Sequence, residues 1–272
     1  MIPATFEYER AESVEETIRL LGSREDAKVL AGGHSLIPLM RFRLARPSLL
    51  VDIGRIGDLS YVREDGDKVA IGALTTHDAV NTSEALRELC PIVAHTAGEI
   101  GDPQVRHMGT IGGSVAHADP ASDMPTVLVA LEADLVIEGP SGSRTVMAGD
   151  FFKGLFTPDL APNEVLTEIR VPNTAGRGWD YQKFHRRAQD WAIVGVAALD
   201  GESARVALTN MGDRPIRASG VEEALAGGAD PTSAAVRAAE GTSPPSDPFG
   251  SAEYRQELAK VLVRRALERS MG

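Results

Sequence analysis

Two pairs of adjacent glycines restrict the fold of this chain more than any other feature. Gly32-Gly33 follows an apolar run that ends at Leu30, and Gly112-Gly113 lies in a glycine-rich stretch over residues 98–123. Glycine has no Cβ and tolerates positive φ, so the backbone at such a pair turns tightly or approaches a ligand closely. Glycine is also in excess, with 27 in 272 residues against a typical ~7%. We therefore expect the two pairs to mark functional loops.

The first loop joins an apolar strand to a short helix that the sequence predicts through residue 43. Its candidate binding residues are Ala31, Gly32, Gly33, His34, Ser35 and Leu36. Backbone amides at a helix N-terminus favour an anion, so a phosphate is the expected ligand. The alternative is a tight strand-to-helix turn with Ser35 as its cap, because the loop has neither a G-x-G-x-x-G nor a P-loop pattern.

The second loop combines adjacent glycines with hydroxyls and carboxylates. Its candidate residues are Gly109, Thr110, Ile111, Gly112, Gly113, Ser114, His117, Asp119 and Asp123. Either aspartate is suited to accept hydrogen bonds from ribose hydroxyls, as an acidic residue does in dinucleotide sites. The alternative is structural, since Asp119-Pro120 is a common turn and Asp123 a common helix cap. Two such loops in one chain favour a dinucleotide site.

Charge and cysteine content exclude several classes of function. Lys and Arg number 28 against 39 Asp and Glu, which gives a net charge of −11 and argues against general nucleic-acid binding. No run approaches the ~18 apolar residues of a membrane helix, and the acidic N-terminus lacks an apolar signal region. We therefore expect a cytoplasmic protein. Cys90, the single cysteine, excludes an internal disulfide and any iron–sulfur cluster or thiolate-held zinc on this chain alone.

The pattern of apolar residues and turn formers predicts a mixed α and β protein with two domains. Residues 1–55 read as strand, helix, strand, helix, strand, with a capping box at Ser13, which is typical of a small parallel sheet. Further strands are predicted over 135–138, 144–147 and 165–171, and a helix over 124–131. The turn formers of 172–178 predict a linker. Beyond it we expect strands over 181–184, 193–199 and 204–209, and helices over 219–227, 231–239 and 252–268.

At the two glycine loops the sequence resembles the flavoprotein (medium) subunit of molybdenum hydroxylases, most closely the carbon monoxide dehydrogenase type. The resemblance spans nearly the whole chain, and the residues that carry it are Met1-Ile2-Pro3, Ala31 to Pro38, Thr110 to Ser114, Tyr181-Gln182-Lys183 and Ala252 to Arg255. It implies an α+β protein with an FAD-binding PCMH-type, vanillyl-alcohol-oxidase-like fold. Two α/β subdomains (about 1–55 and 56–173) would form the FAD-binding domain 1–173, and a C-terminal α+β domain would cover 178–272.

The resemblance also implies roles for individual residues. The first loop would hold the FAD pyrophosphate, and the second would hold further pyrophosphate and adenosine groups. Asp123 resembles the ribose-binding acid, Lys183 a flavin-facing residue, and Trp191 an aromatic residue that covers one face of the flavin. We expect no catalytic residue and no metal ligand on this chain.

Partners and reaction follow from the same resemblance. In such enzymes a large molybdenum-cofactor subunit oxidises the substrate, and electrons cross [2Fe–2S] clusters of a small subunit to FAD. The chain would be an oxidoreductase subunit of the xanthine dehydrogenase family that passes electrons to an external acceptor. We expect a hetero-oligomer, a dimer of heterotrimers. The alternatives are a self-contained FAD-dependent oxidase and a non-enzymatic nucleotide-binding protein.

Some of these residues also have a simpler interpretation. His117 and Asp119, with Asp123 nearby, invite a metal hypothesis, but no H-x₃-H or H-E-x-x-H spacing occurs. Lys183 opens a basic run that also fits a solvated strand edge. For Trp191 the alternative to flavin shielding is core packing.

Overall fold

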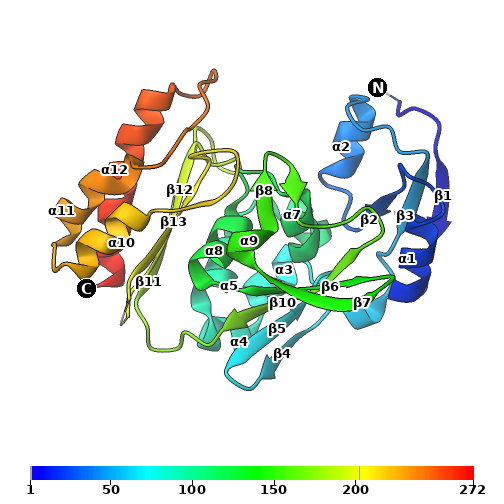
Figure 1. Cartoon of the computed structure of the whole chain (residues 1–272), viewed down its shortest axis with the longest axis horizontal. Coiled ribbons are helices and arrows are strands. Elements are labelled where there is room, and N and C mark those ends of the chain that lie inside the picture. Colours follow the sequence, from blue (N-terminus) through cyan, green and yellow to red (C-terminus); the bar gives the residue numbers. More distant parts are fainter. Residues whose placement is uncertain (1, 202) are drawn as a thin grey trace.

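The computed structural model describes residues 2–201 and 203–272. Met1, where the first predicted domain begins, and Glu202 lie outside the described residues. The chain forms an N-terminal parallel sheet, a central antiparallel sheet with helices on one face, and a C-terminal antiparallel sheet covered by helices (Figure 1). This arrangement confirms the predicted mixed architecture of two N-terminal subdomains followed by a C-terminal α+β unit.

The N-terminal unit has the predicted order of strands and helices. Its elements are β1 (Glu7–Arg10), α1 (Val14–Leu21), β2 (Lys28–Leu30), α2 (Leu36–Arg41) and β3 (Leu49–Asp52). The strands are parallel, in the order β1-β3-β2. Ser13 caps α1 by accepting a hydrogen bond from the amide of Glu16. In the predicted capping box the Glu16 carboxylate would accept from the amide of Ser13, but it accepts from the amide of Glu12 instead. Helix α2 ends at Arg41, two residues before the predicted end.

The central unit is built on a five-stranded antiparallel sheet in the order β4-β5-β10-β6-β7. Its strands are β4 (Val62–Asp65), β5 (Lys68–Gly72), β6 (Asp134–Gly139), β7 (Gly142–Met147) and β10 (Val165–Pro172). The sequence predicted β6, β7 and β10 and missed β4. A short hairpin of β8 (Phe152–Gly154) and β9 (Thr157–Pro158) was also missed, because strands of two or three residues leave no period to detect.

Helices cover one face of this sheet (Figure 1). They are α3 (His77–Thr82), α4 (Glu84–Leu89), α5 (Pro91–Gly98), α6 (Pro103–Met108), α7 (Ile111–His117), α8 (Asp123–Leu131) and α9 (Ala148–Phe151), and the 3₁₀ turn η1 (Gly57–Leu59) precedes β4. All nine residues of α8 are buried, so this helix forms the centre of the largest core cluster. The sequence predicted α8 almost to the residue because its apolar run is long.

The C-terminal unit is a four-stranded antiparallel sheet in the order β11-β12-β13-β14. Its elements are β11 (Trp179–Phe184), β12 (Val194–Leu199), β13 (Arg205–Thr209), β14 (Ile216–Arg217), α10 (Ser219–Ala226), α11 (Pro231–Ala235), η2 (Val236–Ala239) and α12 (Ala252–Ser270). The predicted strands and helices are confirmed. The predicted linker is fixed to the central unit, since Thr174 is buried and its amide donates to the carbonyl of Leu89 at 2.7 Å.

The glycine pair Gly112-Gly113 lies in helix α7, where the sequence predicted a loop. Glycine destabilises helices, but tertiary contacts override this preference. Thr110 caps the helix by accepting from the amide of Gly113 at 3.1 Å. An added Cβ at Gly112 would lie 2.5 Å from the Cβ of Ala73, so the helix approaches the end of β5 at a distance that only glycine allows.

His77, the first residue of α3, is buried beneath the start of α7. Its amide donates to the carbonyl of Gly109 at 2.9 Å, and its Nδ1 has no hydrogen-bond partner among the described residues. Burial, and secondly the nearby Arg106 guanidinium, lowers the pKa of His77 from 6.5 to about 4. The imidazole is therefore neutral in the folded protein at neutral pH.

This burial predicts a loss of stability in acid. Between pH 6.5 and pH 4 the unfolded chain binds a proton at His77 and the folded chain does not, so the free energy of unfolding falls as the pH falls. The contribution of His77 between pH 7 and pH 5 is about 2 kcal/mol. Between pH 7 and pH 5 the free energy of unfolding should fall by about 2 kcal/mol less in His77→Gln than in the wild type. Urea unfolding at both pH values measures this difference. Identical pH slopes for the two proteins would contradict the assignment.

Candidate functional site

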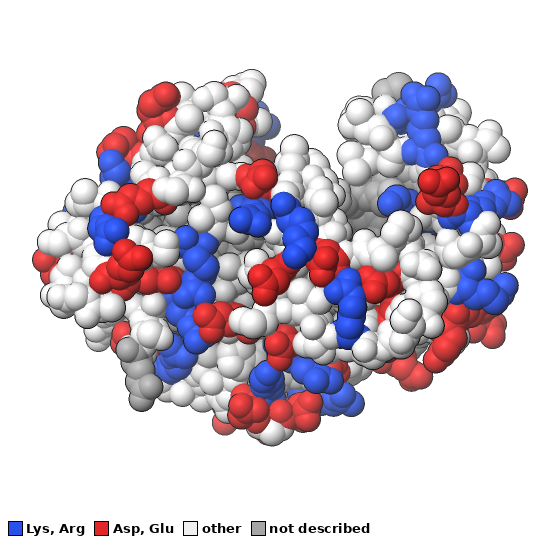
Figure 2. Space-filling model, viewed as in Figure 1, with Lys and Arg blue, Asp and Glu red and all other residues white. Residues whose placement is uncertain are grey.

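The two glycine segments meet at one point in the structure. An added Cβ at Gly32 would overlap the carbonyl group of Met108, so the first loop lies directly against the chain that leads into α7. Sequence analysis did not identify Met108 as a member of the site. Figure 2 shows the surface hollowed between the region of the molecule that carries α2 and the region that carries α7 and the β8–β9 hairpin. The glycine contact therefore brings both predicted loops to one hollow.

The first loop presents a run of free backbone amides. Within the described residues, the amides from Gly32 to Ser35 donate to no protein acceptor. Gly33 has φ +74°, and an added Cβ there would lie 2.8 Å from Cδ1 of Ile37. Ser35 holds the N-cap position of α2, as the alternative expected, but its side chain makes no capping hydrogen bond among the described residues. Successive amides around a left-handed residue form a concavity that suits a phosphate oxygen.

The amides of the second segment are already used inside the protein. Ile111 donates to Thr75 at 3.0 Å, Gly112 to Ala73 at 2.9 Å, and Ser114 to Thr110 at 3.0 Å. Since Gly113 donates to the Thr110 hydroxyl, no amide from 111 to 114 is free for a ligand. This segment offers side-chain hydroxyls and close backbone approach instead. At Gly113 an added Cβ would meet only Oγ1 of Thr110, at 2.8 Å, so the space beyond that contact is open.

His117 and Asp119 shape the chain between α7 and α8. Asp119 accepts from the amide of Ala121 at 2.9 Å, which closes a tight turn. The His117 ring lies 5.1 Å from the ring of Phe156 at the tip of the β8–β9 hairpin. Burial lowers the pKa of His117, although Asp119 opposes this effect. Within residues 2–201 and 203–272, no three His, Cys, Asp or Glu side chains are grouped so that they could hold a metal ion.

Asp123 and Lys183 form a buried ion pair between the central and C-terminal units. Lys183 on β11 donates to Asp123 at 2.8 Å and to the carbonyl of Glu99 at 3.0 Å. Tyr181 on the same strand donates to the other Asp123 oxygen at 2.6 Å. Asp123 is therefore not the N-cap of α8, a position held by Ser122, and both of its carboxylate oxygens already accept hydrogen bonds from the protein. Lys183 is not a solvated edge residue, because its side chain is only 4% exposed.

Protonation of this cluster is governed by its burial. Desolvation raises the pKa of Asp123, while the Lys183 ammonium and the Tyr181 hydroxyl act in the opposite direction. Desolvation and the adjacent carboxylate raise the pKa of Tyr181. Tyr181, which sequence analysis did not assign to the site, therefore remains a hydrogen-bond donor at neutral pH.

Trp191 lies in the loop between β11 and β12 and is 58% exposed, so the core-packing interpretation is wrong. The chain next to it is held by Asn210, whose side-chain amide donates to the carbonyl of Ala192 at 2.9 Å. The backbone amide of Asn210 donates to Pro120 at 2.8 Å. Asn210 thus links the α7–α8 connection to the Trp191 loop. Nothing in the local sequence around Asn210 indicates this role, because both partners are distant along the chain.

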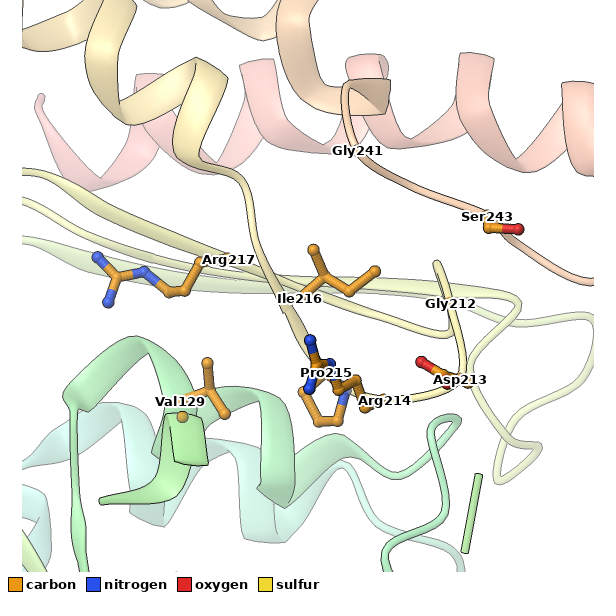
Figure 3. Close-up of a pocket in the computed structure, with 10 residues that line it drawn as sticks. Val129, Gly212, Asp213, Arg214, Pro215, Ile216, Arg217, Gly241 and Ser243 are labelled. Atoms are coloured by element: carbon orange, nitrogen blue, oxygen red, sulfur yellow. The ribbon is translucent and has the colours of Figure 1, made fainter. Parts of the chain in front are cut away.

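A separate cavity of about 630 Å³ lies between the end of α8 and the C-terminal unit (Figure 3). Its lining includes Val129, the segment from Gly212 to Arg217 that leads into and forms β14, and Ser243. None of the predicted cofactor residues lines it. Arg217 is already paired with Glu132 and Glu222, and Arg214 donates to the carbonyl of Phe152. The cavity is therefore not the site that the glycine segments form.

Known proteins resemble this chain in both sequence and structure. Residues 4–174 match the family described as FAD binding domain in molybdopterin dehydrogenase, and residues 179–270 match CO dehydrogenase flavoprotein C-terminal domain. The carbon monoxide dehydrogenase medium chain of Hydrogenophaga pseudoflava is 43% identical over 98% of this chain and 97% of that protein. The glyceraldehyde dehydrogenase medium chain of Sulfolobus acidocaldarius is 41% identical over 98% of this chain and 99% of that protein.

A solved structure of carbon monoxide dehydrogenase from Hydrogenophaga pseudoflava, which lacks the Mo-pyranopterin moiety of its cofactor, matches with a TM-score of 0.96. The match has 43% identity and covers 100% of this chain and 99% of the matched chain. Both glycine segments and the buried Asp123–Lys183 pair lie within the matched ranges. The chain belongs to the FAD-binding medium subunits of the molybdenum hydroxylases, a family of oxidoreductase subunits whose cofactor is FAD.

Proposed function

We propose that this chain carries electrons through FAD, from [2Fe–2S] clusters of a partner subunit to an external acceptor, within a molybdenum hydroxylase complex. The observation that carries the proposal is the run of free amides at Gly32 to Ser35, set against the second glycine segment at the edge of a hollow. Bound FAD supplies the redox chemistry, and the protein supplies binding and electrostatics. The chain brings no cysteine pair with which to hold a cluster.

The two glycine segments offer different kinds of contact to FAD. The free amides of Gly32 to Ser35 are the donors that a pyrophosphate needs, and Ala31 and Leu36 flank them. The second segment, from Gly109 to Ser114, offers close approach at Gly113 and the hydroxyls of Thr110 and Ser114. We assign the pyrophosphate chiefly to the first loop for this reason.

The buried pair has a positioning role in this proposal. Asp123 holds the Lys183 ammonium at the junction of the two units, where resemblance to the family assigns Lys183 to the flavin. A ribose hydroxyl can reach Asp123 only beside or in place of its bonds to Tyr181 and Lys183. Trp191, which is exposed, is free to cover one face of the flavin and exclude water.

The other members of the complex are also proposals. We infer a large molybdenum-cofactor subunit and a small [2Fe–2S] subunit as partners, assembled as a dimer of heterotrimers. The substrate stays open, because relatives named for carbon monoxide and for glyceraldehyde are 43% and 41% identical to this chain. No described helix is both long and apolar enough to cross a bilayer. A cytoplasmic location and domain limits at 173 and 178 stay predictions.

Replacing Gly113 with valine tests the FAD site. The added Cβ would meet only the Thr110 hydroxyl, which also caps α7, and the valine side chain would occupy the close backbone approach proposed for the cofactor. We expect FAD affinity to fall at least roughly tenfold, which is about 1.4 kcal/mol of binding free energy. The measurement is fluorescence titration of the FAD-depleted complex with FAD.

Gly57→Val is the matched control, because an added Cβ there meets no atom within 4 Å and the residue lies outside the predicted site. It should leave FAD affinity unchanged. Equal FAD affinity of wild type and a folded Gly113→Val protein would remove this residue from the site.

A double-mutant cycle tests the buried pair. Asp123→Asn leaves the Lys183 ammonium buried without its counter-charge, and Lys183→Met leaves Asp123 likewise. Each single change should lower the free energy of unfolding by ~3–5 kcal/mol, and the double variant should lose less than the sum of the two. Urea unfolding of the four proteins gives the coupling energy. Additive losses would show that the two groups do not depend on each other.

The source of the electrons distinguishes the proposal from a self-contained oxidase. We expect dithionite to bleach the flavin absorbance of the isolated FAD-loaded chain, while the substrate of the complex leaves that absorbance unchanged. Addition of the partner subunits should then restore bleaching by substrate. Bleaching of the isolated chain by substrate, followed anaerobically at the flavin bands, would support the oxidase instead.

A further inference from the structure

The segment that contains and follows α2 presents exposed apolar and basic side chains. Ile37, Phe42 and Leu44 are 43%, 65% and 76% exposed. Arg41, Arg43 and Arg46 are exposed beside them. We call these six residues the α2 face. Among the described residues, no carboxylate forms an ion pair with any of its three arginines.

The α2 face is opposite in charge to the protein as a whole. No Asp or Glu occurs from Ala27 to Val51, although the chain carries a net charge of −11. Figure 2 shows basic side chains gathered on the region of the surface that carries α2. An acidic partner surface would be repelled by most of this molecule and attracted here, so the charge pattern itself favours one docking orientation.

The backbone of the α2 face is held in one conformation. After α2 ends, Phe42 donates to Pro38 at 3.1 Å, Arg43 to Met40 at 2.9 Å and Leu44 to Leu39 at 2.9 Å. Arg43 adopts φ +58°, which a residue other than glycine rarely does. The exposed side chains therefore project from a fixed turn. A preformed surface loses little conformational entropy on binding.

Aromatic, aliphatic and arginine side chains in one exposed patch are the composition of a protein–protein interface. This inference rests on the proposed function, in which the chain has two partner subunits. The electron-donating subunit must reach the flavin ring, and the residues assigned to that ring, Lys183 and Trp191, belong to the C-terminal unit. That unit and α2 lie at opposite ends of the molecule, with the central unit between them (Figure 1).

We propose that the α2 face is the docking surface for the large molybdenum-cofactor subunit, which contributes an acidic rim around an apolar pocket. The arginines pair with the rim, and Phe42 and Leu44 enter the pocket. Desolvated arginine and aromatic contacts of this kind carry most of the binding energy in known interfaces.

The test is assembly of the three-subunit complex from co-expressed chains, captured through a tag on the large subunit. The variant is Arg41→Glu with Leu44→Glu, and the control is Arg265→Glu with Val236→Glu. The control makes the same change of charge at two exposed positions of the C-terminal unit, Val236 being 64% exposed. We expect the α2-face variant to reduce captured medium chain at least tenfold and the control to match the wild type.

Three further readouts make the result specific. Both double variants should keep the wild-type thermal midpoint and FAD content, because none of the four residues lies in the cofactor loops. Wild-type affinity for the large subunit should weaken as NaCl is raised, and the α2-face variant should lose most of this salt dependence. Capture of the variant through a tagged small subunit without the large subunit should equal that of the wild type.

Wild-type capture of the α2-face variant by the large subunit would overturn the proposal. Equal losses in variant and control would also overturn it, because the effect would then be one of net charge. Loss of binding to the small subunit alone would assign the face to the other partner. Capture contains no electron-transfer step, so these outcomes are independent of whether FAD receives electrons as proposed.

Discussion

The contact between Gly32 and the carbonyl group of Met108 is the constraint on which the site depends. No side chain fits between the two segments, so this single missing Cβ lets the parallel-sheet unit and the helical layer of the central unit touch. Gly112 has the same role at the start of α7, where it rests on Ala73. These two glycines therefore set how closely the first glycine loop, the second segment and the end of β5 approach one another. Glycine in this protein is required first for packing and only then for access of a ligand.

The two glycine segments differ in what they leave free. In the second, the amides of Ile111 and Gly112 bond to Thr75 and Ala73, and those of Gly113 and Ser114 bond to Thr110, so the amides from 111 to 114 are not free for a ligand. The first keeps its amides unused. One wall of the hollow therefore has amides that are bonded within the protein, and the other has amides that are free.

The Asp123–Lys183 pair joins the C-terminal unit to α8 of the central unit. Burying both charges costs several kcal/mol per ion, and only close geometry with further hydrogen bonds offsets the cost. Tyr181 and the carbonyl of Glu99 supply those bonds. The backbone amide of Asn210, which donates to the carbonyl of Pro120, adds an uncharged link between the same two units. The orientation of β11 relative to α8 is therefore tied to a charged cluster rather than to apolar contact alone.

The sequence by itself determined the family, the order of elements in the first 55 residues and most elements of the C-terminal unit. The helix–strand alternation of the first 55 residues, the long apolar run of α8 and the two glycine motifs act locally, so their patterns survive without tertiary information. Tertiary structure decided what these residues do. Whether Gly112 lies in a loop or a helix depends on Ala73, and whether Asp123 is a cap or one half of an ion pair depends on Lys183 of β11, 60 residues away. The exposure of Trp191 and the neutrality of His77 likewise depend on surroundings that only the folded chain assembles. Burial and partners distant along the chain set the protonation state and the hydrogen bonds of these side chains. The local sequence specifies neither the burial nor the partners.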